Sequence, residues 1–435
     1  MRRDVPAPAP ATTAPAATAA DELARERVRE LLALRTQANE RFFAASAEPL
    51  ARLCHVMAER FGDGGRLIAL GASPQARSDA RHVAVEFVHP VIVGKRALPA
   101  RALTGEFGVL RAEVELAAEP GDLAIAFGSD AEVAAALDAA RQRGCLTIAF
   151  DGVGADWELA PAPGDAFVRQ ELTETAYHVL WELVHVFFEH RGGTGRKPRA
   201  TGAREPDPNG ARELGAAGFL YPFLSDSGAG DRDAGDGDAL ERVIDDVRGS
   251  IAMKAREISA LRAQTLDENA ETLIAAANTL RERLHAGGTV LALGNGGSAT
   301  DAMDAVADLR AAPAGWAPRR AIDLTEDPSI VTAIANDVGI GAIFSRQVIA
   351  HGRTGDALLA FSTSGGSANI VRALAEARER GLAMVALVGY DGGEIAAGKL
   401  ADHVIVTRSQ SIPRIQEAQA SAWHVLRELI ELDGR

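Results

Sequence analysis

Short apolar runs alternate with amphipathic stretches along the first half of the chain. Helical periodicity predicts one or two long helices over 21–60 and a closing helix over Val168–Glu189. Apolar runs predict buried strands at Arg66–Leu70, Leu98–Leu103, Leu123–Phe127 and Leu146–Phe150. Strands that alternate with helices are typical of a parallel sheet covered by helices on both faces.

The same pattern returns in the second half. Long helices over Leu240–Leu284 lead into a second series of predicted strands, at Thr289–Leu293, Ala321–Leu324, Ala357–Phe361, Ala383–Val388 and His403–Val406. A closing helix over Pro413–Leu432 aligns with the first one, because Gln170-Glu171 matches Gln416-Glu417 and His178 matches His424. We therefore predict an α/β fold of two tandem domains, each a mainly parallel five-stranded sheet flanked by helices, with long N-terminal helices.

Composition shifts mark the expected boundaries between these units. Residues 1–20 are rich in Ala, Pro and Thr and predict a disordered tail rather than a signal peptide. The first domain is expected over 21–191 and the second over 239–435, with a Gly-, Asp- and Pro-rich linker at 192–238. The apolar patch Phe219–Leu224 inside this linker is expected to dock on one of the domains.

Length and charge exclude several kinds of partner. The 435 residues are 47% hydrophobic, yet no apolar run approaches the roughly 20 residues needed to cross a bilayer. The formal net charge of −14 disfavours nucleic acid as the main partner. Two cysteines without metal-ligand spacing suit a reducing compartment, so a cytoplasmic location is expected.

Two turns in the second half predict an anion site. The strand that ends at Leu293 leads into Gly294–Ser298 and then into a helix, a pattern in which free N–H groups can face an anion. The strand that ends at Phe361 leads into Ser362-Thr363-Ser364-Gly365-Gly366-Ser367, which adds hydroxyl donors. Either turn alone could be an ordinary tight connection or a helix cap. Together they favour phosphate binding.

These residues also carry a family resemblance. The segments GNGGS, AND, IFSRQV, FSTSGGSANIVRAL and RIQEAQ resemble the phosphoheptose isomerases of the sugar isomerase (SIS) superfamily, over most of 240–432. The resemblance implies that a sugar phosphate binds to the two turns through Asn295, Gly296, Gly297, Ser298, Ser362, Thr363, Ser364 and Ser367. It further implies substrate contacts by Asn336, Asp337 and Gln416.

The same resemblance implies a catalytic Glu on the first helix of the unit and a catalytic His on the last. It also implies a zinc site made by a His one turn before that Glu, the Glu itself, and a Gln and the His of the closing helix. The second half keeps Gln416 and His424 but has Asp304 and Asp308 at the His and Glu positions. Asp308 and His424 therefore remain catalytic candidates with an altered base.

The first half shows the opposite departure. His82 and Glu86 stand at the family's His and Glu positions, and Gln170 and His178 complete a set that could bind zinc or another divalent metal. Its turns have changed, because Pro74 removes an N–H donor and Asp130 and Glu132 bring carboxylates to where a phosphate would lie. An exposed polar helix face is the plainer interpretation of His82 and Glu86 alone.

These departures lead to one composite hypothesis. The phosphate turns of the second half would join His82, Glu86, Gln170 and His178 of the first, with Glu86 and His178 as acid–base groups. The implied reaction is isomerisation of sedoheptulose 7-phosphate to a D-glycero-heptose 7-phosphate through an enediol. A homodimer would then approximate the family's tetramer. The alternative is a non-catalytic protein that senses sugar phosphates or acts as a scaffold.

Overall fold

The computed structural model describes residues 19–91, 95–105, 108–191 and 236–432. The predicted tail falls almost wholly outside these residues, as do most of the predicted linker and its patch Phe219–Leu224. Among the described residues, no helix is both long and apolar enough to span a membrane.

Each half of the chain forms one five-stranded sheet in which every strand pair is parallel. The strands of the first sheet are β1 (Leu67–Gly71), β2 (Ala100–Leu103), β3 (Leu123–Phe127), β4 (Leu146–Ala149) and β5 (Trp157–Glu158). Those of the second are β6 (Val290–Leu293), β7 (Ala321–Asp323), β8 (Ala357–Ser362), β9 (Ala383–Gly389) and β10 (His403–Thr407). The orders β2-β1-β3-β4-β5 and β7-β6-β8-β9-β10 are the same, so the two sheets share one topology.

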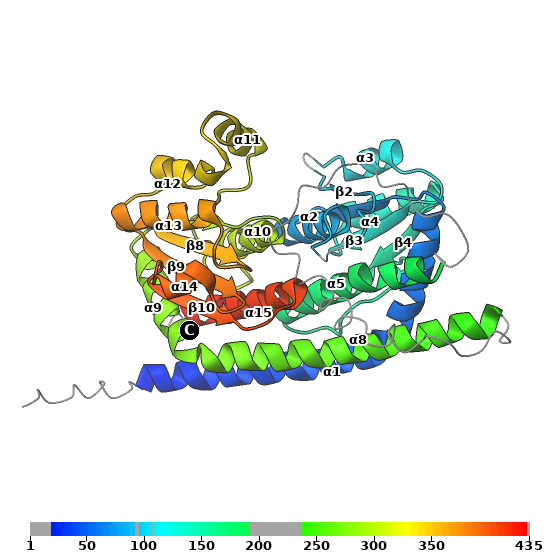
Figure 1. The fold of residues 1–435 in the computed structure, drawn as a ribbon, viewed down its shortest axis with the longest axis horizontal. Coiled ribbons are helices and arrows are strands. Elements are labelled where there is room, and N and C mark those ends of the chain that lie inside the picture. Colours follow the sequence, from blue (N-terminus) through cyan, green and yellow to red (C-terminus); the bar gives the residue numbers. More distant parts are fainter. Residues whose placement is uncertain (1–18, 92–94, 106–107, 192–235, 433–435) are drawn as a thin grey trace, which may run out of the picture.

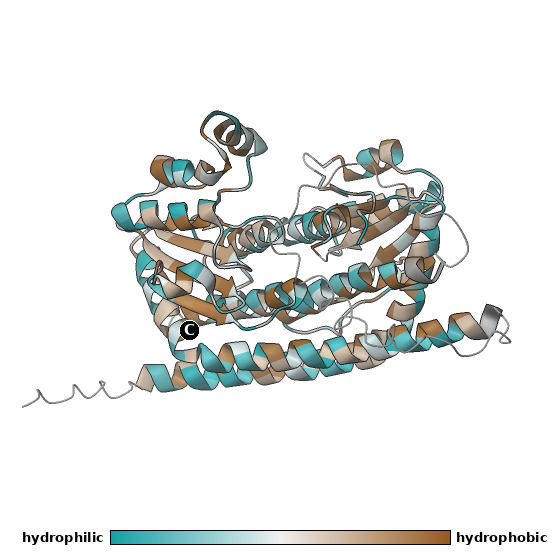
Figure 2. Ribbon diagram, viewed as in Figure 1, coloured by the Kyte–Doolittle hydropathy of each residue, from teal (hydrophilic) through white to brown (hydrophobic). Residues whose placement is uncertain are grey.

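Helices cover both faces of each sheet (Figure 1). Those of the first half are α1 (Ala19–Gly62), α2 (Pro74–Val88), α3 (Leu110–Ala117), α4 (Ala131–Gln142) and α5 (Ala166–Arg191). Those of the second half are α8 (Asp236–Glu268), α9 (Ala270–His285), α10 (Gly297–Arg310), α11 (Pro328–Asp337), the short 3-10 turn η2 (Ile340–Ala342), α12 (Ser345–His351), α13 (Ala368–Glu379), α14 (Gly393–Ala397) and α15 (Ile412–Ile430). In Figure 2 the strands are mostly hydrophobic, whereas the helices that cover them carry both hydrophobic and hydrophilic residues.

The α/β class and the main strands are confirmed, and the differences are local. The two-residue strand β5 and the eight-residue helix α3 have too few residues to show a period. The long helices predicted over Leu240–Leu284 are two, α8 and α9, which meet at Asn269. The side chain of Asn269 donates to the carbonyl of Val406 and accepts from its N–H, which ties this junction to the edge strand β10.

The two long helices α1 and α8 lie side by side and run beneath both sheets (Figure 1). Val28 and Leu31 of α1 are buried in the core of the second sheet, whereas Ile244 and Val247 of α8 are buried in the core of the first. Burial of each such side chain stabilises the fold by roughly 1.5–3 kcal/mol. Each core is therefore completed by a helix from the other half, which fixes the two halves against each other.

Candidate active site between the two halves

The site forms where equivalent helices of the two halves pack together. Helix α2 packs against α10, and the closing helix α5 packs against α15. At the first of these contacts, the hydroxyl of Ser78 donates to the buried carbonyl of Thr300 at 2.9 Å. Side chains from the two halves of the chain thus meet in one buried region.

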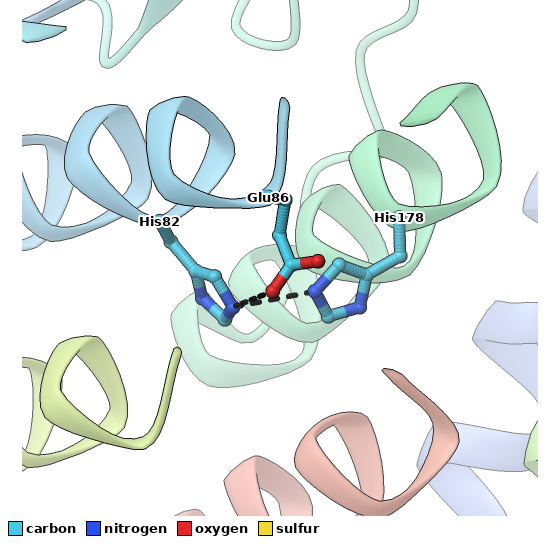
Figure 3. A group of neighbouring side chains, drawn as sticks. All are labelled: His82, Glu86 and His178. Atoms are coloured by element: carbon cyan, nitrogen blue, oxygen red, sulfur yellow. Dashed lines mark hydrogen bonds and ion pairs between the residues drawn. The ribbon is translucent and has the colours of Figure 1, made fainter. Parts of the chain in front are cut away.

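His82, Glu86 and His178 point toward one another in this interior (Figure 3). His82 and Glu86 are one turn apart on α2, and their Nε2 and Oε1 atoms are 4.0 Å apart. The Nε2 atom of His178 on α5 is 3.3 Å from that of His82. The exposed fractions are only 1%, 2% and 0% for His82, Glu86 and His178, so bulk water does not screen their charges.

Helix α15 of the second half completes the cluster. The Gln416 side-chain amide lies 3.2 Å from His82 Nε2. The Glu417 carboxylate lies 2.9 Å from His178 Nδ1 and also pairs with Arg414 at 2.8 Å. A carboxylate oxygen accepts a hydrogen bond from an Nδ1–H group, and in that tautomer of His178 the lone pair is on Nε2, toward His82. The cluster is therefore built from both halves.

Burial shifts the pKa values of two groups in this cluster. Burial raises the pKa of Glu86 to about 7 against a weaker opposing effect of His178, so its carboxylate is close to balance between acid and base near neutral pH. Burial and the neighbouring His178 lower the pKa of His82 well below its ordinary value. His82 is thus a neutral imidazole.

The glycine-rich turn of the second half adjoins this cluster. Gly297 packs against the side-chain amide of Gln416 so closely that a Cβ atom at position 297 would clash with it. Gln416 in turn contacts His82, so the turn and the cluster are linked through one side chain. Asn295 and Asn369 exchange two amide hydrogen bonds of 3.0 and 2.8 Å, which join this turn to the start of α13, directly after the serine-rich turn.

The serine-rich turn offers both fixed and free hydroxyls. Ser362 is buried and accepts from the N–H of Gly365, whereas Ser364 is exposed and Thr363 and Ser367 are half-buried. Ser298 is buried in the first turn of α10. The exposed members suit an incoming anion, and the buried ones shape the loop.

In the equivalent turns of the first half, side chains of the protein already accept hydrogen bonds from the backbone N–H groups. The hydroxyl of Ser73 caps α2, and Asp130 caps α4 by accepting from the N–H groups of Glu132 and Val133. The N–H of Gly128 donates to the Asp151 carboxylate at 2.8 Å. Because carboxylates occupy these donors, this edge of the first sheet would repel a phosphate.

Gln170, which was expected to join the metal set, bonds to a residue of the second half instead. The amide of Gln170 donates to Asp304 at 2.9 Å, and Gln416 takes the place beside His82. The reason is the packing of the closing helices, in which the first turn of each faces the α2 or α10 helix of the other half. Gln170 therefore belongs to a second centre, together with Asp304, Asp308 and His424.

The second centre is a closed set of ionic and hydrogen bonds. The Nδ1 atom of His424 lies 2.8 Å from Glu171, and its Nε2 atom lies 3.6 Å from Asp308. The indole N–H of Trp423 donates to Asp308 at 2.9 Å. Burial opposes the charged form of His424, but its contacts with Asp308 and Glu171 prevail and raise its pKa to about 9. Asp308 is committed to these partners.

Asn336 and Asp337 lie at the end of α11. Both are exposed, and the amide of Asn336 donates to Asp337 at 2.7 Å. Among the hydrogen bonds of the described residues, these two side chains have none with the phosphate turns, so their expected substrate contact stays a prediction.

The sequence interpretation overlooked Glu171 and Glu417, which orient the two histidines. A signal was present, because the Gln-Glu pair recurs at the same place in both closing helices. That pair indicated a repeat, but a repeat within one chain does not reveal contacts between its copies.

The donors around His82 fit a divalent metal. Imidazole nitrogen and carboxylate oxygen are ordinary zinc ligands, and 3.3 Å between the two Nε2 atoms is close to the edge of a tetrahedron with bonds of about 2.0–2.1 Å. The Oε2 atom of Glu86 is buried without a hydrogen-bond partner among the described residues. His82, Glu86, His178 and Gln416 are therefore the residues that could hold such an ion.

Known proteins resemble this chain in sequence and in fold. The SIS domain family model matches residues 255–389. A phosphoheptose isomerase of Rhodospirillum rubrum is 42% identical over 167 residues, which cover 38% of this chain and 88% of that protein. A phosphoheptose isomerase of Geobacter sp. is 36% identical over 197 residues, which cover 43% of this chain and 96% of that protein.

One solved structure aligns along almost the whole chain. Tagatose-6-phosphate ketose/aldose isomerase from Escherichia coli has a TM-score of 0.52 at 13% identity, and the alignment covers 93% of this chain and 92% of that one. At this identity the likeness shows the fold alone. It extends over both sheets.

The bonds of His424 predict a pH-dependent stability. Its pKa of about 9 exceeds the ordinary 6.5, so the folded protein holds a proton that the unfolded chain releases. This stabilisation, on the order of 3 kcal/mol, is complete below about pH 6.5 and is lost as the pH rises through about 9. Urea unfolding between pH 6 and pH 10 measures it. His424→Gln is expected to flatten the profile, whereas His285→Gln, at an exposed position, is not; equal profiles in all three proteins would contradict this account.

Proposed function

Because the chain belongs to the phosphoheptose isomerase family of SIS-domain proteins, we propose that it is an aldose–ketose isomerase of sugar phosphates with one working centre per chain. The observation that carries this proposal is the position of Gln416. Its side chain contacts both the intact glycine turn of the second half and His82 of the first. A phosphate on the turns would therefore lie beside the buried acid–base cluster.

The two turns would hold the phosphate of the substrate. Backbone N–H groups at Gly296 and Gly297 and the hydroxyls of Ser364 and Ser367 are the donors that this role requires. With the phosphate fixed, the other end of the sugar would extend toward Glu86 and His178. We propose sedoheptulose 7-phosphate as the substrate and a D-glycero-heptose 7-phosphate as the product.

Glu86 would transfer the proton between the two carbon atoms. Its carboxylate would remove a proton from C1 of the ketose, giving an enediol, and would return that proton to C2. A carboxylate whose pKa is about 7 can do both near neutral pH. His178, oriented by Glu417, would exchange the proton between the oxygens on C1 and C2. The alternative role of Glu86 and His178 is to hold a zinc ion together with His82 and Gln416; such an ion would polarise the carbonyl group.

The second centre would not catalyse the reaction. Trp423 and His424 both contact the Asp308 carboxylate, and a base must be free to reach the proton that it removes. The turns of the first half, which would supply its phosphate site, carry Asp130 and Asp151 instead. We propose that this centre only stabilises the fold.

We also propose that two chains form a homodimer through the arm 328–351. None of the residues of α11 is buried, although the helix is rich in apolar side chains. Ile330, Val338 and Ile340 are 38%, 58% and 68% exposed. A second copy is the occupant that the family resemblance suggests, because active sites in that family form where subunits meet. Such a cover would remove this apolar surface from water.

Substitution of the two candidate bases separates the centres. Glu86→Gln is expected to lower kcat at least a hundredfold, because general-base catalysis contributes about 10²–10⁴. Asp308→Asn is expected to retain most of the activity while it lowers the melting temperature. Isomerisation of sedoheptulose 7-phosphate by the purified full chain measures the first effect. If Glu86→Gln were fully active, or if wild type bound the sugar phosphate without proton exchange, the proposed centre would be wrong.

The phosphate turn can be tested against its counterpart in the first half. Ser364→Ala is expected to raise KM about tenfold or more, because a hydrogen bond to a charged group contributes about 1.5–3 kcal/mol. Ser129→Ala, at the matching turn of the first half, should leave KM unchanged. Steady-state kinetics compares the two variants. Equal effects would show that the two turns are not distinguished in this way.

The dimer is tested by molar mass. Light scattering is expected to give twice 45.6 kDa for the wild type and a single chain for Ile340→Asp, since a charge in an apolar interface is costly. Leu116→Asp on α3, where the leucine is 89% exposed, is the matched control and should stay dimeric. A monomeric wild type would rule out the dimer.

A further inference from the structure

A polar pocket of about 470 Å³ lies at the amino ends of the strands β6, β7 and β8. The two phosphate turns follow the carboxyl ends of β6 and β8, so the pocket is at the opposite edge of the same sheet. The six residues of β8 separate the two edges by about 20 Å. The pocket is therefore distinct from the candidate active site.

Two arginine side chains give this pocket its charge. Arg320 directly precedes β7, and Arg353 lies in the loop before β8. Both residues are exposed. Among the described residues, neither guanidinium group forms a hydrogen bond or an ion pair with another group of the protein. Both cations are thus available to a ligand from outside the chain.

The carboxylate that lines the pocket belongs to the buried residue Asp356. One of its oxygens accepts from the N–H of Thr289 at 2.8 Å, and the other accepts from the N–H of Arg353 at 2.9 Å. Both oxygens therefore hold the two loops together. Two arginines against one carboxylate leave the pocket with a positive charge, in a chain whose formal net charge is −14.

The same loops recur in the first half. Asp122 takes the place of Asp356, because its two oxygens accept from the N–H groups of Arg66 and Glu119 at 2.8 and 3.0 Å. Glu119 therefore stands where the second half has Arg353. The backbone contacts are the same in both halves, whereas the charge at this position is reversed.

In the first half the charges of these loops neutralise one another. The guanidinium group of Arg66 donates to Asp122 at 2.7 Å and pairs with Glu119 at 3.3 Å. The carbonyl groups of Pro99 and Arg320 accept from the first residues of β1 and β6, so the first half has a proline where the second has Arg320. Unpaired cations are therefore specific to the second half.

We propose that this pocket binds the phosphate group of a small phosphate ester. The planar guanidinium group matches two phosphate oxygens and keeps its charge at neutral pH. Two such groups line one concave site, to which Thr289 adds a hydroxyl and the half-buried Ile322 an apolar wall. The volume lies within the range of about 300–1,000 Å³ typical of small-molecule sites. A phosphorylated molecule would thus bind without occupying the phosphate turns.

Calorimetric titration of the full chain with glycerol 3-phosphate and with inorganic phosphate tests this inference. The wild type is expected to show two sites for the ester per chain, and binding at the pocket should weaken at high ionic strength. Arg320→Ser is expected to weaken the pocket site about tenfold or more, because bonds to a charged group are lost. Arg353→Glu, which introduces the residue type of the first half, should abolish it.

Two further variants assign the sites. Ser364→Ala is expected to weaken the site at the phosphate turns and to leave the pocket site unchanged. Arg101→Ser, at an exposed position of β2, removes the same charge as Arg320→Ser and should keep both sites. Circular dichroism checks that each variant is folded.

A wild type with a single site for the ester, or a folded Arg353→Glu variant that keeps both sites, would overturn the inference. Binding of inorganic phosphate but not of glycerol 3-phosphate at the pocket would overturn the assignment to an ester. The inference does not depend on the proposed function, because the pocket shares no residue with the phosphate turns or the buried cluster. A folded wild type that lacks isomerase activity and keeps the site at Arg353 would refute only the proposed function.

Discussion

Two reciprocal contacts between carboxylate and imidazole hold the centre of this molecule together. Glu417 of the second half meets His178 of the first, and Glu171 of the first meets His424 of the second, at 2.9 and 2.8 Å. All four side chains are buried. Removal of either partner from such a pair would leave an uncompensated group in the interior, at a cost of about 3–5 kcal/mol for a full ion pair. The halves are therefore coupled through the same residues that shape the two centres.

The same pairing of a carboxylate with an imidazole gives two different centres, because the residues around the two pairs differ. Around His178, Arg414 shares the Glu417 carboxylate, and the Nε2 edge of the ring points toward His82 and Glu86. Around His424, Asp308 replaces a glutamate and is held by Trp423, so both ring nitrogens have partners. A centre whose groups all have partners adds stability, whereas catalysis needs groups that are buried and still available.

Periodicity predicted the main strands, the closing helices and the division between intact and altered turns, because these depend on local sequence. The composite cluster was also predictable, since the missing groups of one half were present in the other. The position of Gln170 was not, because the register of a helix does not say which neighbour its first turn faces. For the same reason, nothing local indicated that Val28 of α1 packs in the core of the second sheet.

The exchange of α1 and α8 explains how such asymmetry can persist. Because each core contains a helix segment from the other half, neither half completes its core alone, and the pair is maintained as one unit. The turns of one centre can then change without loss of the fold, and the other centre can carry a carboxylate such as Glu174 where its counterpart has Ala420. In a symmetric assembly of identical subunits, every substitution would alter all the centres together. Joining the two units in one chain removes that constraint.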